Sequence, residues 1–280
     1  MNYEIDFIGV KNQTKDALAI CLRWYSEQAK RYIVVVYDGG YKEHGEEMCG
    51  ILKKYYFADG NIPMIDLVIC SHSDEDHSLG LTVLFDHFTV KNLVMNRPWR
   101  FLEELEPYVG DGRKTTASIE RELREIFSAV DKLEQKAIEL GTKVYDGFRS
   151  KPFAGVFSSL RILAPAKETY LKRIIESSKT PFVAKSSTEH ISRGLLAALL
   201  TPQEIWEIDS LREDVTTTPE NETSIVLMGD MGRKKFLLTG DAGKLALSEA
   251  ADYAEAQGID LKCVNVHQIP HHGCQVHFSV

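Results

Sequence analysis

The sequence has few cysteines, no long apolar run and no excess of positive charge. Its five cysteines form no CxxC pair, and three of them lie within or at the end of apolar runs, where a reduced thiol behaves as a small hydrophobe (Cys21, Cys70 and Cys263). A disulfide scaffold is therefore excluded. No stretch approaches the roughly 20 apolar residues that span a bilayer, and the first six residues lack the basic and apolar regions of a secretory signal. We expect a cytoplasmic protein without a membrane partner.

The charge balance is acidic, with 33 Lys and Arg against 41 Asp and Glu and a net charge of -8. This balance excludes a protein coated in positive charge for gripping duplex DNA, although a local basic groove remains compatible with it. The 280 residues are 44% hydrophobic and 26% charged, as in ordinary folded domains, and they contain no internal repeat or low-complexity tract. The length allows one large α/β domain or two small ones.

Strand patterns concentrate near the two ends of the chain. In the first part, alternating or continuous apolar runs predict three strands, a helix and a buried strand at 3–10, 17–24, 32–37, 44–57 and 65–70. After residue 220, the patterns predict a hairpin, a helix and a last strand at 224–238, 244–257 and 261–269. Residues 99–220 have helical spacing and dense charge instead, apart from a short strand at 160–163. We therefore expect residues 1–98 and 221–280 to form the core, and residues 99–220 to form a mostly helical insertion within the same domain.

The strongest chemical signal is the stretch His72-Ser73-Asp74-Glu75-Asp76-His77, which directly follows a predicted buried strand. Imidazole nitrogen and carboxylate oxygen are ligands of Zn²⁺ and Mn²⁺, and a tight loop can aim alternate side chains into one cavity. Such closely spaced carboxylates repel one another unless a cation lies among them. The stretch therefore predicts a bound metal, against the alternative of a solvated acidic loop with incidental histidines.

Two further segments place candidate ligands at the ends of predicted strands. Asp241 ends the run Leu237-Leu238-Thr239-Gly240-Asp241, where a carboxylate can bridge two cations, and His271 with His272 follows the last predicted strand. Taken alone, Asp241 is more often a turn residue or a helix cap, and a histidine pair is more often part of the surface. Together with the first motif, these groups can meet at one edge of a sheet, and the combination predicts a shared metal site.

With these motifs, the sequence resembles the metallo-β-lactamase superfamily and, within it, the ComEC-type metallohydrolases. The resemblance covers residues 1–98 and 221–276 and is carried by Asp38-Gly39-Gly40, the 71–77 motif, Asn221 with Ser224, Thr239-Gly240-Asp241 and His271-His272-Gly273. It implies an αββα sandwich with one or two divalent metals, Zn or Mn, along one edge. Domains of this type usually continue past the His-His-Gly motif with another strand and helix, so we expect a sandwich that lacks them. A second copy or a partner chain would then pair with the open strand edge.

The resemblance also implies a role for individual residues. His72 would hold the first metal and Asp76 with His77 the second, while Asp241 would bridge them. Asp74 stands where most of the superfamily has a second histidine, an exchange typical of the ComEC-type branch, which makes the first site oxygen-rich, so that it would fill weakly or prefer Mn²⁺ over Zn²⁺. The implied metal ligands are His72, Asp74, Asp76, His77, Asp241 and His271.

The implied catalytic residues are Asp74, Asp76 and His272. If Asp74 is not a ligand, it is placed to accept a proton from the attacking water. Which of His271 and His272 binds metal stays open; we favour His271, which leaves His272 to contact substrate. Asp38 is expected to support the loop beneath the ligands. The superfamily's histidine between the two halves is missing, and the nearest residues to that place are Asn221 and Ser224.

The implied reaction is metal-assisted hydrolysis, and the leading hypothesis is a phosphodiesterase or nuclease. The net negative charge favours a single strand of nucleic acid or a small phosphodiester over a long duplex as the substrate. The alternatives are hydrolysis of a small ester, thioester, lactone or β-lactam, or a non-catalytic metal-binding interaction module. A separate motif, Arg97-Pro98-Trp99-Arg100, could grip a phosphate and stack on a base, although packing is the commoner role for such a tryptophan.

Overall fold

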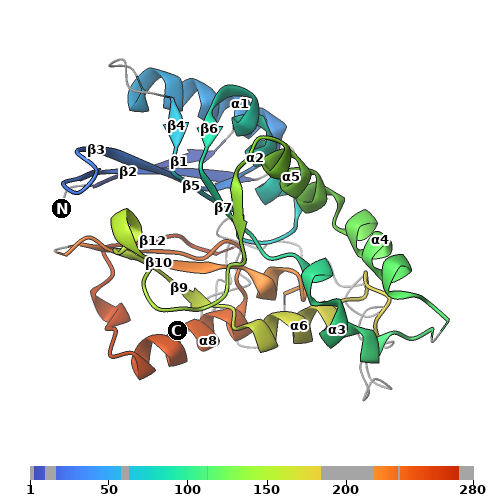
Figure 1. Cartoon of the computed structure of the whole chain (residues 1–280). Coiled ribbons are helices and arrows are strands. Elements are labelled where there is room, and N and C mark those ends of the chain that lie inside the picture. The colour runs from blue at the N-terminus through green and yellow to red at the C-terminus, as the bar shows by residue number, and fades with distance from the viewer. Residues whose placement is uncertain are drawn as a thin grey trace, which may run out of the picture.

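Two β-sheets lie face to face between two layers of helices (Figure 1). The computed structural model describes residues 3–9, 17–57, 63–111, 113–183, 217–232 and 234–270. The protein is therefore a mixed α/β fold of the αββα type that the sequence predicts. None of the helices in the described ranges is long and apolar enough to cross a membrane.

The first sheet has six strands in the order β1-β2-β3-β5-β7-β8. Its first three strands are antiparallel, and the others run parallel to β3. Because parallel strands end at the same edge of a sheet, the residues that follow β3, β5 and β7 share that edge. The bounds are Tyr3–Gly9, Leu18–Ser26, Arg31–Gly39, Leu67–Ile69, Asn92–Val94 and Lys143–Tyr145. The short strands β4 (Met64–Ile65) and β6 (Thr89–Val90) pair separately.

Helices cover the outer face of the first sheet because they bury one apolar stripe against it. Met48 and Leu52 contribute to this core from the first helical segment, and Leu81 and Leu84 contribute from α2. Within the stretch of helical spacing, residues 116–139 form two helices that break at Phe127, whose φ and ψ are -100° and 44°. The bounds are α1 Lys42–Ile51 with a π-helical turn at Leu52–Tyr56, α2 Glu75–His87, α4 Thr116–Ile126 and α5 Ser128–Glu139.

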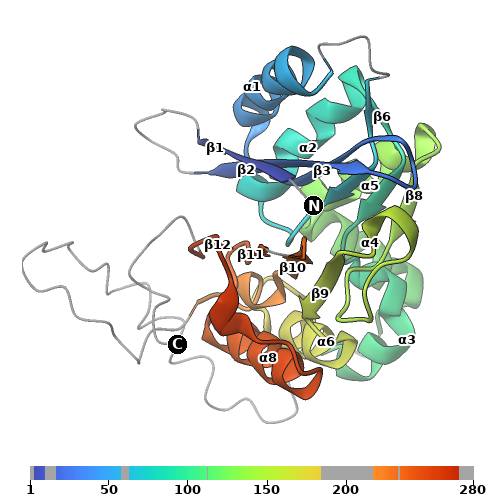
Figure 2. The same cartoon turned by 90° about the vertical axis from the view of Figure 1, so that its left-hand side faces the viewer.

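The second sheet has four strands in the order β12-β11-β10-β9. The predicted hairpin is present as β10 and β11, but only two residues of the predicted strand at 261–269 pair, because a 3₁₀ turn at Leu261–Cys263 takes up its beginning. The helix α8 (Lys244–Ala256) packs on the outer face through alanines four residues apart, on the side of the molecule opposite α1 and α2 (Figure 2). The strand bounds are β9 Leu160–Ala164, β10 Val226–Asp230, β11 Lys235–Leu238 and β12 Val266–His267.

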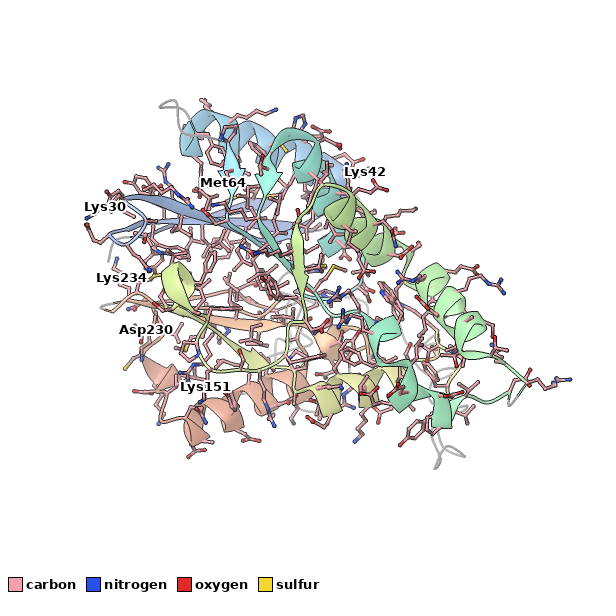
Figure 3. All side chains as sticks on the ribbon, in the orientation of Figure 1. Lys30, Lys42, Met64, Lys151, Asp230 and Lys234 are labelled. Atoms are coloured by element: carbon pink, nitrogen blue, oxygen red, sulfur yellow. The ribbon has the colours of Figure 1, made fainter. Side chains whose placement is uncertain are left out.

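Side chains of both sheets fill the space between them (Figure 3). Trp24 and Tyr37 from the first sheet and Phe236 from the second are almost completely buried there. Burial of a large aromatic side chain contributes roughly 3 kcal/mol or more to folding. This shared core fixes the distance between the sheets, and therefore between the loops that each sheet carries at its edge.

Residues 99–220 contribute helices and also one strand to each sheet, since β8 joins the first sheet and β9 the second. Besides α4 and α5, the described residues of this stretch form the helices α3 Leu102–Leu105 and α6 Lys167–Glu176. The phosphate-binding interpretation of Arg97 and Trp99 is wrong, because both side chains are buried. Arg97 pairs with Glu134 at 2.8 Å and with Asp146 at 2.7 Å, and the Trp99 indole N–H donates to Glu134 at 2.9 Å.

Candidate metal centre

Three segments from both sheets bring candidate ligands to one edge of the sandwich. Asp38 lies at the end of β3, and His72 follows β5 in the loop that leads into α2. His77 is in the first turn of α2, while Asp241 lies in the turn between β11 and α8. Since β3 and β5 are parallel, their ends meet, and the second sheet presents its own turn across the shared core.

The imidazoles of His72 and His77 and the carboxylate of Asp241 form a buried group, here called the buried trio. Their potential ligand atoms all lie within 4.8 Å of one another. The Nε2 atom of His77 is 3.2 Å from Oδ1 of Asp241, and the two imidazole centroids are 4.2 Å apart. Two imidazole nitrogens and one carboxylate oxygen are a donor set suited to a divalent cation such as Zn²⁺.

Hydrogen bonds orient both imidazoles through their Nδ1 atoms. Ser71 Oγ lies 3.0 Å from Nδ1 of His72, and Asp38 Oδ2 lies 2.9 Å from Nδ1 of His77. These contacts leave the two Nε2 atoms facing the middle of the trio. Nε2 of His72 is buried and has no hydrogen-bond partner within the described ranges. Because buried polar atoms are almost always satisfied, this atom fits a ligand to a cation.

Asp38 supports two parts of the centre at once, as the sequence predicts. Its Oδ1 atom accepts a hydrogen bond from the backbone N–H of Ser71 at 2.7 Å, and its Oδ2 atom holds His77. The residue has a φ of 56°, in the left-handed region that aspartate and asparagine tolerate better than most other residues. The carboxylate therefore fixes both the loop after β5 and the first turn of α2.

The two histidines have opposite pKa shifts. Burial and repulsion from His77 lower the pKa of His72 below its ordinary value. Burial also opposes charge on His77, but the carboxylates of Asp38 and Asp241 outweigh this effect and raise the pKa of His77 well above its ordinary value. A ligating imidazole is neutral, so a cation that binds here would displace the proton of His77.

Asp74 and Asp76, predicted as ligands, lie at the rim of the trio. Asp74 Oδ2 is 3.8 Å from Nε2 of His72, and Asp76 Oδ2 is 3.8 Å from Nε2 of His77. Their side chains are 31% and 24% exposed, whereas the buried trio is almost fully covered. The remaining predicted residues, His271 and His272, lie outside the described residues.

Side chains from two other segments hold the turn around Asp241, and one of these side chains, Gln268, is not indicated by any motif. Gln268 Oε1 accepts hydrogen bonds from the backbone N–H groups of Thr239 and Gly240, and Ser224 Oγ accepts one from that of Asp241. Gly240 has a φ of 53°, and a Cβ atom there would lie 2.7 Å from Ser71 Oγ. The sequence could have indicated Ser71, because it stands next to His72 in the 71–77 motif. It could not have indicated Gln268, because the position of this residue depends on the pairing of β11 with β12.

Asn221 and Ser224 lie in and just after the 3₁₀ turn Asn221–Thr223 that precedes β10. The Asn221 side-chain amide donates to Thr217 Oγ1 at 2.8 Å, and Ser224 is held by the backbone of Asp241 at 3.2 Å. Both side chains are buried and take part in these contacts. Ser224 therefore helps to position the turn that carries Asp241, whereas the Asn221 side chain is held by Thr217.

Replacing Asp38 with Asn is expected to lower metal affinity by about 10- to 100-fold, the usual effect of removing a carboxylate that orients a ligating histidine. The substitution suits the test because Asn keeps the shape and tolerates the left-handed backbone. Competition with a chromophoric chelator measures the affinity. Asp86→Asn, which removes an exposed charge paired with Lys136, is the control and should leave the affinity unchanged. Equal affinities in the two variants would contradict the role of Asp38.

Searches of protein-family models and of curated protein sequences find no match to this chain. Among solved structures, it is similar to the metallo-β-lactamase SMB-1 bound to 2-mercaptoethanesulfonate, with 9% identity, a TM-score of 0.39 and coverage of 95% of this chain and 76% of that chain. It is also similar to MEM-A1, a subclass B3 metallo-β-lactamase from a soil metagenome library (10% identity, TM-score 0.39, coverage 96% and 76%). A metallo-β-lactamase from Hirschia baltica gives 10% identity, a TM-score of 0.38 and coverage of 99% and 94%. These scores are too low to carry an argument about function.

Proposed function

We propose that this protein is a metal-dependent hydrolase that cleaves phosphodiesters. The observation that supports it most directly is the buried trio of His72, His77 and Asp241, in which hydrogen bonds to Nδ1 turn both Nε2 atoms inward. A divalent cation held there would supply a Lewis acid and a water of lowered pKa. The absence of a compensating cation would leave a costly concentration of buried polar groups in the fold.

Several residues would share the roles of binding the cation, orienting its ligands and accepting a proton. His72, His77 and Asp241 would hold the cation, while Asp38 and Ser71 keep the two imidazoles in the required orientation. Asp74, partly exposed at the rim, would accept a proton from an attacking water or act as a further ligand. From the resemblance alone, we assign Asp76 and His271 as additional ligands and His272 as a substrate contact.

The preference for phosphodiesters follows from the oxygen donors around the trio. Asp74, Asp76 and Asp241 add carboxylate oxygens to the two imidazoles, a mixture compatible with Zn²⁺ and with Mn²⁺, and hard cations bind phosphate oxygen well. The net charge of -8 favours a small phosphodiester or a single strand over a long duplex. The resemblance to ComEC-type metallohydrolases points to the same substrates.

A substrate screen tests the proposal directly. The protein is purified, its metals are measured by mass spectrometry, and it is assayed with bis-p-nitrophenyl phosphate, single-stranded DNA and nitrocefin. We expect turnover of a phosphodiester that a chelator abolishes and added Zn²⁺ or Mn²⁺ restores. Hydrolysis of nitrocefin without phosphodiester cleavage would favour the β-lactam alternative. A protein that neither retains metal nor takes it up would favour a non-catalytic interaction module.

A further inference from the structure

Lys179 places a cationic side chain beside the rim of the candidate metal centre. It lies in the turn that follows α6, and its Nζ atom is 3.6 Å from Oδ1 of Asp74. The other oxygen of the same carboxylate is 3.8 Å from Nε2 of His72. The ammonium group is therefore separated from the buried trio by a single carboxylate.

The backbone around Lys179 is held firmly in place. Its N–H donates to Ser177 Oγ at 3.1 Å, and that hydroxyl in turn donates to the buried carboxylate of Glu220. Thr180 Oγ1 donates to the carbonyl of Ile174 at 2.8 Å, which ties the turn to the last residues of α6. Glu220 Oε2 also lies 3.9 Å from Nζ of Lys179. A fixed backbone with carboxylates on two sides directs the side chain toward the rim.

The ammonium group retains capacity for a ligand. Neither of its ion pairs with residues that the structure describes, at 3.6 Å and 3.9 Å, is within ordinary hydrogen-bond distance, and the side chain is 51% exposed. An exposed pair of this kind adds little to fold stability. The rim itself is acidic, since Asp74, Glu75 and Asp76 follow one another there, and it would repel an anionic substrate. A lysine at this point offsets the repulsion where a substrate would approach.

We propose that Lys179 binds an anionic oxygen of the substrate, such as a non-bridging phosphate oxygen, and so determines a preference for anionic over neutral substrates. The inference rests on the proposed function, because it assigns a substrate group to the same centre. Lysine suits this role as a compact point charge with three donors on a flexible stem. The residue binds substrate and takes no part in proton transfer.

Binding of inorganic phosphate and hydrolysis of bis-p-nitrophenyl phosphate together test this inference on the metal-loaded full chain. Titration calorimetry should show that Lys179→Gln weakens phosphate binding roughly tenfold or more, the scale of a lost charge-assisted contact. The KM should rise by a similar factor, with a smaller change in kcat. Lys179→Arg should restore most of the affinity. The control is Lys172→Gln on α6, which removes an exposed lysine 3.9 Å from Glu176 and should change neither value.

Each result decides one of the two proposals. Unchanged phosphate affinity and KM in Lys179→Gln would overturn the role of Lys179, even in a protein that hydrolyses phosphodiesters well. Loss of metal from this variant would overturn it too, because Lys179 would then act only by holding Asp74. If the wild type binds phosphate through Lys179 but cleaves no phosphodiester, the proposed function fails while the binding role stands. A wild type that binds no phosphate would overturn the binding role.

Discussion

Replacing Asp241 with Asn is expected to reduce phosphodiester hydrolysis about a thousandfold or more and to remove most of the bound metal. The carboxylate is the only negatively charged member of the buried trio, and its Oδ1 atom lies 3.2 Å from Nε2 of His77. Lewis-acid stabilisation supplies several kcal/mol of transition-state stabilisation, and each 1.4 kcal/mol is about a tenfold change in rate. Asn keeps the volume and one oxygen but lacks the charge that attracts a cation.

The measurements for Asp241→Asn are metal content by mass spectrometry, kcat/KM and the midpoint of thermal unfolding. The thermal midpoint of the metal-free protein should fall, because the substitution removes a carboxylate that stabilises charged His77, but the variant should still fold, since Asn fills the same space and the backbone N–H of this residue still donates to Ser224 Oγ. Asp252→Asn, on an exposed position of α8, is the matched control and should behave as the wild type. Full activity with normal metal content in Asp241→Asn would remove this residue from the centre.

The sequence predicts the part of the centre that is set by strand ends. His72 and Asp241 each follow an apolar run, and parallel or facing strands bring such ends together without further information. His77 is predictable because it lies in the same motif, only five residues after His72, and the structure places it in the first turn of α2. The αββα arrangement is implied by the resemblance to the metallo-β-lactamase superfamily, and the two packed sheets confirm it.

The features that the sequence did not predict depend on contacts between distant segments. Lys179 carries no local signal, because a lysine in a polar stretch is usually solvated, and only the packing of α6 places it beside Asp74. The sequence favours packing for Trp99 but gives no sign that Glu134 from α5 pairs with Arg97 and accepts the Trp99 indole N–H inside the fold. The break between α4 and α5 at Phe127 cannot be located from the sequence, because the apolar spacing continues from one helix into the next.

Gly80→Ala is expected to destabilise the fold by about 3 kcal/mol or more and to weaken metal binding at the same time. A Cβ atom at Gly80 would overlap the carbonyl oxygen of Gly39 and lie 2.6 Å from the carbonyl oxygen of Tyr41. Overlap with backbone is costly because the backbone has little room to move, unlike the end of a flexible side chain. The helix α2 would have to move away from the end of β3.

This displacement reaches the metal centre because α2 carries His77 and β3 carries Asp38. The contact between these two side chains is 2.9 Å, and the Gly80 N–H donates to the Gly40 carbonyl at 2.7 Å in the same region. When α2 shifts, His77 loses its orienting carboxylate, for which a 10- to 100-fold lower metal affinity is the usual scale. Urea unfolding of the metal-free protein and a chelator competition would measure the two effects separately.

Gly50→Ala in α1 is the matched control for Gly80→Ala, since no heavy atom lies within 4 Å of a Cβ atom built at Gly50. Alanine there should stabilise the protein by up to about 1 kcal/mol through its higher helix propensity and leave metal affinity unchanged. If Gly80→Ala were as stable as the wild type, the approach of α2 to β3 would not require glycine. If it lost stability but kept full metal affinity, the position of His77 would not depend on this contact, and the link between the packing of α2 and the metal centre would be refuted.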